Sequence, residues 1–190
     1  VLAALAEQVY KSAAVPFGTI RHSRCYWKLV QAQAARLYLF PVWQRALDAA
    51  ERHNPKVAFR VQLSNPQFQP DQLALPLFLI PRIPLVKIGR IPRKPEAQYL
   101  EPRYDHPEFQ RAFNELNDLL AARFDGHPLI EWMDLMQYGF LGEGHTIDFL
   151  SSFPDQATAK HTFVQMTARH LAAWQRPPIT VNTQPAIRTA

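Results

Sequence analysis

The 190-residue chain has little of what several classes of protein require. Its single cysteine, Cys25, permits neither an internal disulfide nor a cysteine-rich metal site. Its seven histidines show no His-Glu-x-x-His spacing, and we therefore expect no catalytic metal and no other cofactor. The Gly-x-Gly-x-x-Gly and Gly-x-x-x-x-Gly-Lys-Ser/Thr loops are also missing, which counts against the nucleotide-binding α/β folds.

Long hydrophobic runs and dense clusters of one charge are scarce as well. No apolar run is long enough to cross a bilayer, so we expect no membrane partner. The net charge is +5, but the cations are spread along the chain, and prolines interrupt the densest group, between Arg82 and Lys94. Because a DNA-binding protein typically carries a continuous basic stripe on a helix, we expect no nucleic-acid partner.

What is present indicates one globular domain. The chain is 47% hydrophobic and 12% aromatic, and its length allows a substantial core. We assign residues 18–190 to this domain. Residues 1–17 form an N-terminal segment that is compatible with the remnant of a signal peptide or of a linker. The compartment stays open, with secretion or a periplasmic location among the options.

Segments rich in strand formers alternate with segments of helical periodicity. We expect strands within residues 18–30, 56–63, 129–135 and 179–183. Helices are expected to start at Pro41, after the N-cap Asp105, and at Asp155 or Thr158. Residues 64–104 are proline-rich and predict a long, irregular but packed loop. This alternation favours an α/β fold with a parallel sheet, either an open doubly wound sheet or part of a (β/α)₈ barrel.

The segment from Met136 to Thr146 is the most informative part of the chain. It follows an apolar strand and places Glu143 and His145 among three of the six glycines. Glycine allows tight turns and close approach to a ligand, and α/β proteins build sites in loops that follow strands. Glu143 is therefore the candidate catalytic residue, with a solvated turn as the alternative. His145 either hydrogen-bonds Glu143 or a ligand, or caps backbone groups.

Other polar and aromatic residues are candidates for binding. Arg60 and Gln62 share one face of a buried strand, and a buried arginine usually serves a carboxylate. Asp134 needs a partner too, either in a structural pair with Arg60 or Arg21 or in a catalytic role. The remaining candidates are Tyr26 and Trp27, as a stacking platform or as core, and Gln137 and Asn182. We expect Arg60, Gln137, Glu143, His145 and Asn182 to converge at the carboxyl ends of the strands.

Several stretches resemble a known family when taken in order. Residues 25–30, 46–50 and 57–60 resemble the opening of the β-galactosidase-like (β/α)₈ barrels of glycoside hydrolase clan A, especially family 42. Residues 104–109 and 120–128 resemble the region that leads into the fourth strand of these barrels. Residues 138–146, YGFLGEGHT, are similar to the yG-wGEwHt motif of uncharacterised glycosidase-like barrel proteins. The resemblance extends from about Gly18 to Gln184.

The resemblance implies a retaining O-glycoside hydrolase that acts on a carbohydrate through two carboxyl groups. Its acid/base would lie after the fourth strand. However, Gln137 stands where family 42 has its glutamate, so Glu143 would have to replace that acid. The family's nucleophile lies on the seventh strand, so we expect the chain to be the N-terminal half of the barrel and to need the C-terminal half as its partner. A non-catalytic carbohydrate-binding barrel and a fragment without a site are the alternatives.

Overall fold

The computed structural model describes residues 21–38, 41–53, 56–67, 69–91, 94–139, 142–144 and 150–181. The N-terminal segment 1–17 and two of the candidate site residues, His145 and Asn182, lie outside these ranges. The fold is mixed α/β, as the sequence predicts.

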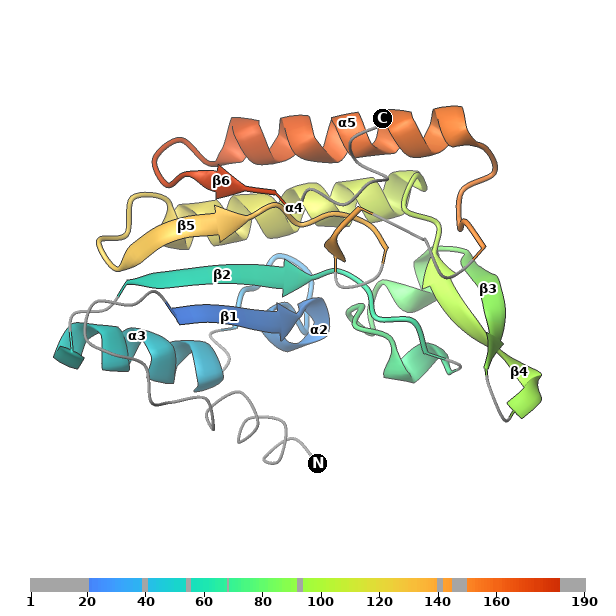
Figure 1. Ribbon diagram of the computed structural model, residues 1–190, viewed down its shortest axis with the longest axis horizontal. Helices are drawn as coiled ribbons and strands as arrows, with labels where there is room; N and C mark the ends of the chain where they lie inside the picture. Colours follow the sequence, from blue (N-terminus) through green and yellow to red (C-terminus); the bar gives the residue numbers. More distant parts are fainter. Residues whose placement is uncertain are drawn as a thin grey trace.

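The centre of the fold is a parallel sheet of four strands (Figure 1). Its strands lie in the order β1 (Arg21–Tyr26), β2 (Val57–Gln62), β5 (Ile130–Asp134) and β6 (Ile179–Thr180). The connecting helices are α3 (Pro41–His53), α4 (Pro107–Phe124) and α5 (Gln156–Ala173). The parallel sheet expected from the strand–helix alternation is confirmed, and its strands lie in the order in which they occur in the sequence. Short connections through helices place successive parallel strands side by side.

The helices α3, α4 and α5 pack on the same face of this sheet. The ring of Phe59, in β2, lies 4.7 Å from the ring of Trp43 in α3 and 5.3 Å from that of Phe124 in α4. It also lies 5.9 Å from the ring of Trp174, the C-cap of α5. A single side chain meets residues of all three helices, and side chains of a strand alternate between its faces. In the described residues, this arrangement differs from a doubly wound sheet, which has helices on both faces.

The opposite face of the sheet carries polar side chains. In β2, Arg60 and Gln62 alternate with Phe59 and Val61 and therefore point away from the helices. Tyr26, at the end of β1, is the register partner of Gln62. Asp134, at the end of β5, is the register partner of Thr180 in β6. The polar ends of neighbouring strands thus meet on the face opposite α3, α4 and α5. This face carries no helix among the described residues and is called the helix-free face below.

The first strand is shorter than expected. It ends at Tyr26, and Trp27–Val30 forms the short helix α2 instead of continuing the strand. The backbone N–H of Gln31 donates to the carbonyl of Trp27, 3.0 Å away, which closes this turn. Trp27 and Val30 are fully buried in the core. Their burial in a helical turn overrides the strand preference of the local sequence.

The proline-rich segment contains a hairpin that the sequence did not predict. Strand β3 (Leu85–Ile91) pairs antiparallel with β4 (Lys94–Pro102), and two short 3₁₀ turns, η1 (Pro70–Gln72) and η2 (Ile80–Arg82), precede them. The segment is packed, as expected, with Leu73, Leu75, Leu79, Ile83 and Ile88 buried. The backbone N–H of Leu150 donates to the carbonyl of Ile88 at 2.7 Å, which ties the hairpin to the region after β5.

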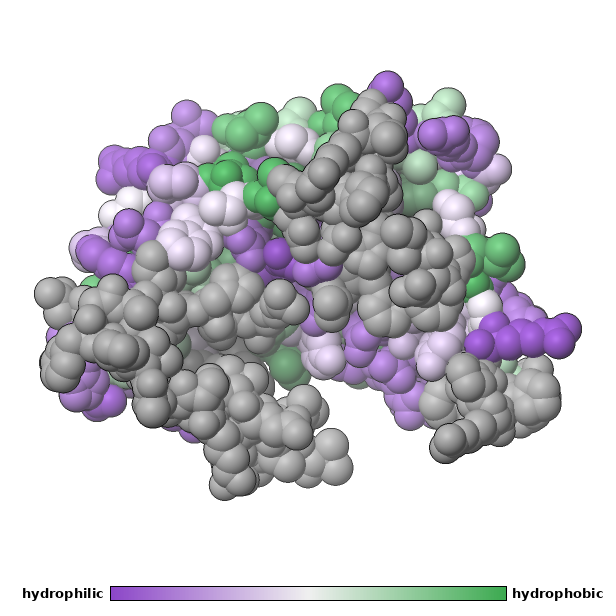
Figure 2. All heavy atoms as spheres, viewed as in Figure 1, coloured by the Kyte–Doolittle hydropathy of each residue, from purple (hydrophilic) through white to green (hydrophobic). Residues whose placement is uncertain are grey.

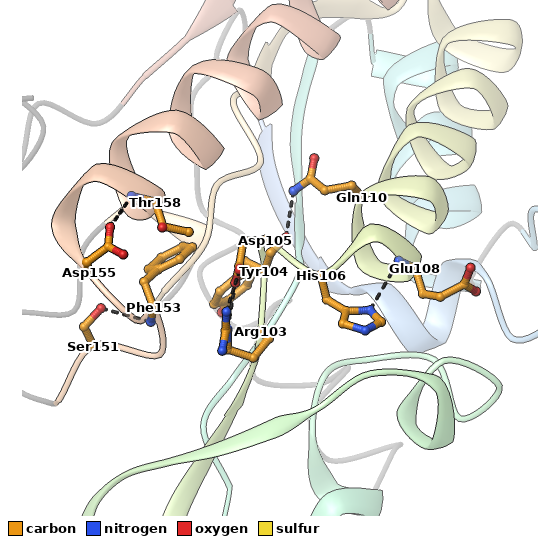
Figure 3. A network of polar contacts seen from close by, with 10 residues as sticks. All are labelled: Arg103, Tyr104, Asp105, His106, Glu108, Gln110, Ser151, Phe153, Asp155 and Thr158. Atoms are coloured by element: carbon orange, nitrogen blue, oxygen red, sulfur yellow. Dashed lines mark hydrogen bonds and ion pairs between the residues drawn. The ribbon is translucent and has the colours of Figure 1, made fainter.

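The sequence predicted the N-cap of α5 correctly but not that of α4. Asp155 is the N-cap of α5, and its carboxylate accepts the Thr158 N–H at 2.7 Å (Figure 3). The N-cap of α4 is His106, whose Nδ1 accepts the Glu108 N–H at 3.3 Å. The expected N-cap, Asp105, is instead paired with Arg103 at 2.6 Å.

The surface of α5 is partly apolar. Val164 and Leu171 are exposed on this helix, and Figure 2 shows apolar side chains reaching the surface along the upper edge of the molecule, where α5 lies in Figure 1. Within the described ranges, no helix is long and apolar enough to cross a membrane.

Candidate functional site

Arg60 joins two carboxylates on the helix-free face of the sheet. Its Nη1 lies 3.1 Å from Glu143 Oε1, and its Nη2 lies 3.1 Å from Asp134 Oδ2. The Nε of Arg60 also donates to Asp134 Oδ2, at 3.2 Å. The three residues come from β2, from the end of β5 and from the glycine-rich loop that follows β5. Of the alternatives given for Asp134, the structure shows the pair with Arg60.

The ion-pair cluster is buried, which strengthens the attraction between its opposite charges. Arg60, Asp134 and Glu143 are only 5%, 9% and 8% exposed. The Oγ1 of Thr180 donates to the second oxygen of Asp134, which anchors that carboxylate to β6. One guanidinium bridges two carboxylates in a site of low dielectric, where the attraction between opposite charges is strong.

The loop that carries Glu143 depends on its glycines. Gly139, Gly142 and Gly144 all have positive φ, at 80°, 71° and 72°. The loop is closed by backbone hydrogen bonds, in which the Gly142 N–H donates to the Gly139 carbonyl at 3.1 Å and the Gln137 N–H donates to the Gly142 carbonyl at 3.1 Å. A Cβ atom on Gly142 would lie 3.4 Å from the Gln137 carbonyl and 3.8 Å from the Arg60 side chain. Glycine therefore lets the loop turn tightly beside Arg60 and direct Glu143 onto it.

A third buried carboxyl group lies beside this loop. Glu101, at 1% exposed, accepts a hydrogen bond from the hydroxyl of the fully buried Tyr104 at 3.1 Å. The same hydroxyl accepts the N–H of Gly139 at 3.0 Å. Burial raises the pKa of Glu101 from 4.5 to about 8, although the bond from Tyr104 lowers it. Sequence reasoning missed Glu101, since only the hairpin, itself unexpected, brings it to the loop.

A buried histidine supports the other side of the β5 end. The Nε2 of His170, in α5, accepts the Met136 N–H at 3.1 Å. Burial lowers the pKa of His170 from 6.5 to about 3, so the ring is neutral at ordinary pH. Its Nδ1 has no hydrogen-bond partner in the described part of the chain. His170 thus fixes the backbone where β5 passes into the glycine-rich loop.

The structure separates the predicted binding residues into two groups. Gln62 is buried on the same face as Arg60, and Tyr26, half-buried beside it, accepts a hydrogen bond from Asn65 at 3.3 Å. Trp27 does not belong to the site. It is fully buried and its indole N–H donates to Gln31 at 2.7 Å, so it has no free face on which a sugar could stack, which agrees with the alternative that Trp27 is a core residue.

Gln137 is held by a helix. It is buried, and its side-chain amide donates to Thr167 Oγ1 of α5 at 2.9 Å. Its carbonyl oxygen, Oε1, has no hydrogen-bond partner among the residues described. The Gln137 side chain is therefore anchored to α5, whereas Glu143 faces Arg60.

The position of the loop in the sheet also differs from the expectation. Glu143 follows β5, which is the third strand of the described sheet, whereas the family resemblance places the acid/base after the fourth strand. Among the described residues, no group of three or more His, Cys, Asp or Glu side chains could hold a metal ion. Comparison with known proteins gives no matching family model and no match to a curated protein.

Proposed function

We propose that the protein is a carbohydrate-active barrel of the O-glycoside hydrolase type, with Glu143 as its acid/base. The observation that carries this function is the buried bridge from Arg60 to Glu143 and Asp134. A buried charge cluster is costly to maintain unless its geometry is excellent. The cluster lies where the parallel strands end, on the face without helices, which is where barrel enzymes form their sites.

The arrangement of the sheet supports a barrel. Four parallel strands with helices on one face and a polar surface on the other correspond to half of an eight-stranded barrel. In such a barrel the helix-free face is the interior, and Arg60, Gln62 and Asp134 would line it. The function we propose therefore includes further strand–helix units that complete the barrel and supply the nucleophile.

In a retaining mechanism, Glu143 would first donate a proton as the general acid and then accept one as the general base. A retaining glycosidase protonates the leaving oxygen with one carboxyl group while a second attacks the sugar, and the first then activates water. Arg60 holds the Glu143 carboxylate in a fixed orientation at 3.1 Å. Arg60 also contacts Asp134, so the guanidinium fixes both carboxylates relative to the strands that carry them.

A carbohydrate-binding barrel without hydrolysis is the second candidate. It is favoured by Gln137, which stands at the position of the family's acid and whose amide is tied to Thr167. An amide cannot act as a general acid. In this case Arg60 and Glu143 would serve only to bind sugar hydroxyl groups.

The substitution Glu143→Gln in the full-length protein tests the assignment. It should abolish hydrolysis of natural glycosides, whose leaving groups need protonation, a contribution of about 10²–10⁴ in rate. It should spare the first step on a 4-nitrophenyl glycoside, whose leaving group departs without help. Added azide should then restore turnover and release a glycosyl azide, because this anion attacks without a general base.

The matched control is Glu131→Gln, which changes an exposed carboxylate in β5, the strand that precedes the Glu143 loop. It should leave the kinetics of both substrates unchanged. Unaltered hydrolysis of natural glycosides by Glu143→Gln would assign the acid/base elsewhere. A wild-type protein that binds oligosaccharides in calorimetry but never cleaves them would establish the binding barrel, and one that does neither would rule out both functions.

A further inference from the structure

A hydrogen-bonded chain connects the hairpin to the loop that carries Glu143. Tyr104 follows the hairpin strand β4, and its hydroxyl donates to Glu101 Oε1 at 3.1 Å. The Tyr104 hydroxyl oxygen in turn accepts the N–H of Gly139, the first glycine of the loop, at 3.0 Å. The loop then closes on itself through the bond from the Gly142 N–H to the Gly139 carbonyl, one residue before Glu143.

The hydroxyl of Tyr104 has little freedom to make other bonds. The Tyr104 ring is fully buried, 5.1 Å from the ring of Phe109 in α4, 5.8 Å from that of Tyr138 and 5.9 Å from that of Phe153. Figure 3 shows Tyr104 between the start of α4 and the segment that leads into α5, with Phe153 beside it. Its backbone carbonyl is also held, by the Gln110 side-chain amide at 2.7 Å. The ring is thus locked from several sides, which directs its hydroxyl at Gly139.

Glu101 completes the arrangement as the acceptor for Tyr104. It is 1% exposed, and its Oε2 has no hydrogen-bond partner in the part of the chain that the structure describes. An uncompensated buried carboxyl oxygen costs stability, so packing alone does not account for glutamate at this position. Its oxygen Oε1 takes the Tyr104 proton, which leaves the lone pairs of the phenol oxygen for the Gly139 N–H.

We infer that Glu101 and Tyr104 are positioning residues, which hold the glycine-rich loop in the conformation that presents Glu143 to Arg60. The importance of this role for catalysis rests on the proposed function. The positioning itself can be measured without a substrate. Gly139 bonds to Gly142, the residue before Glu143, so an anchor on Gly139 from outside the loop helps to keep Arg60 Nη1 and Glu143 Oε1 3.1 Å apart.

Amide hydrogen exchange in the wild-type protein and in Tyr104→Phe tests the inference. The substitution keeps the ring and removes only the hydroxyl. The Gly139 and Gly142 amides should then exchange about tenfold faster relative to the amides of β2, as expected for one lost buried hydrogen bond. The carboxyl carbon resonance of Glu143 should shift, because its contact with Arg60 loosens. If the wild-type protein cleaves a 4-nitrophenyl glycoside, kcat should fall and KM should change little.

The matched control is Tyr138→Phe. Tyr138 belongs to the same aromatic group, and its hydroxyl has no hydrogen bond to a described residue. It should leave loop exchange and the Glu143 resonance unchanged. Glu101→Gln keeps an acceptor oxygen and should preserve loop protection, whereas Glu101→Leu removes the acceptor that orients the Tyr104 hydroxyl and should reduce protection by no more than Tyr104→Phe does.

Unchanged protection of Gly139 in Tyr104→Phe, or equal loss in Tyr138→Phe, would overturn the positioning role. So would faster exchange spread evenly over β2 and the loop, because that pattern reports global destabilisation. These outcomes are independent of hydrolysis. If the wild-type protein is inactive but its loop exchanges faster in Tyr104→Phe, the proposed hydrolase activity would be rejected. The positioning role of Glu101 and Tyr104 would still stand.

Discussion

At the scale of single residues, Arg60 is the side chain whose partners the sequence predicted best. The alternating pattern of β2 places it on a buried strand, and a buried guanidinium needs a carboxylate. Asp134 was expected to be paired for the same reason, and the two lie 3.1 Å apart. The sequence did not reveal Glu101 or His170 as neighbours of the loop. Their environment is created by packing between elements that are distant in the chain, which no local pattern encodes.

Removing Arg60 should be strongly destabilising. In Arg60→Met the side chain keeps its approximate length, but two buried carboxylates lose the guanidinium that bridges them. We expect the free energy of unfolding at pH 7 to fall by about 3–5 kcal/mol, as found when one partner of a buried pair is removed. Urea denaturation followed by fluorescence measures this change.

The triple variant Arg60→Met, Asp134→Asn, Glu143→Gln is the control. It removes the uncompensated charges as well, so it should recover most of the stability lost in Arg60→Met. Arg60→Lys keeps the charge but cannot reach both carboxylates in the same geometry, and it should fall between the two. A loss below about 1 kcal/mol in Arg60→Met, typical of exposed pairs, would mean that the cluster is open to solvent.

At the scale of elements, periodicity predicted the strands and helices of the sheet but not the connections. The helix α3 begins at Pro41 and α5 is capped by Asp155, both as expected. The hairpin of β3 and β4 was missed because prolines at positions 84, 95 and 102 obscured its alternation. Proline is tolerated at the ends of strands and on edge strands, and these two strands form a sheet of their own, in which each is an edge.

The N-cap of α4 is His106 in the structure, whereas the sequence predicted Asp105, and substitutions can decide between them. His106→Ala removes the acceptor of the Glu108 N–H and should lower the free energy of unfolding by about 0.5–2 kcal/mol. His106→Asn restores an acceptor and should recover most of this loss. Asp105→Ala removes only the pair with Arg103 and should cost a few tenths of a kcal/mol. Thermal denaturation measures all three variants, and a larger cost for Asp105→Ala would assign the cap to Asp105.

At the scale of the whole molecule, the sheet separates an apolar face from a polar one. Phe59 anchors the apolar face, where it meets aromatic rings from α3, α4 and the end of α5. Strand–helix alternation was sufficient to predict the parallel order, because right-handed crossovers leave few other arrangements. It could not predict which side chains would meet on the polar face. That depends on the register of β5 and β6 and on the long-range contact between the hairpin and the glycine-rich loop.

Two buried groups should give the whole molecule an unusual dependence of stability on pH. Burial raises the pKa of Glu101 to about 8, so between its ordinary value of 4.5 and pH 8 only the unfolded chain loses this proton, and stability falls as pH rises. Burial lowers the pKa of His170 to about 3, so between pH 6.5 and 3 only the unfolded chain gains a proton, and stability falls as pH falls. Each slope is about 1.4 kcal/mol per pH unit.

The two slopes oppose each other between pH 4.5 and 6.5, where the wild-type protein should be most stable and nearly insensitive to pH. Single variants separate them in urea denaturation at fixed pH values. In Glu101→Gln, stability should rise from pH 4.5 to 6.5 and then stay level to pH 8, because only the His170 term remains. In His170→Gln, which keeps an acceptor for the Met136 N–H, stability should fall steadily from pH 4.5 to 8. A flat profile between pH 4.5 and 6.5 in either variant would show that the remaining group titrates normally and is open to water in the folded protein.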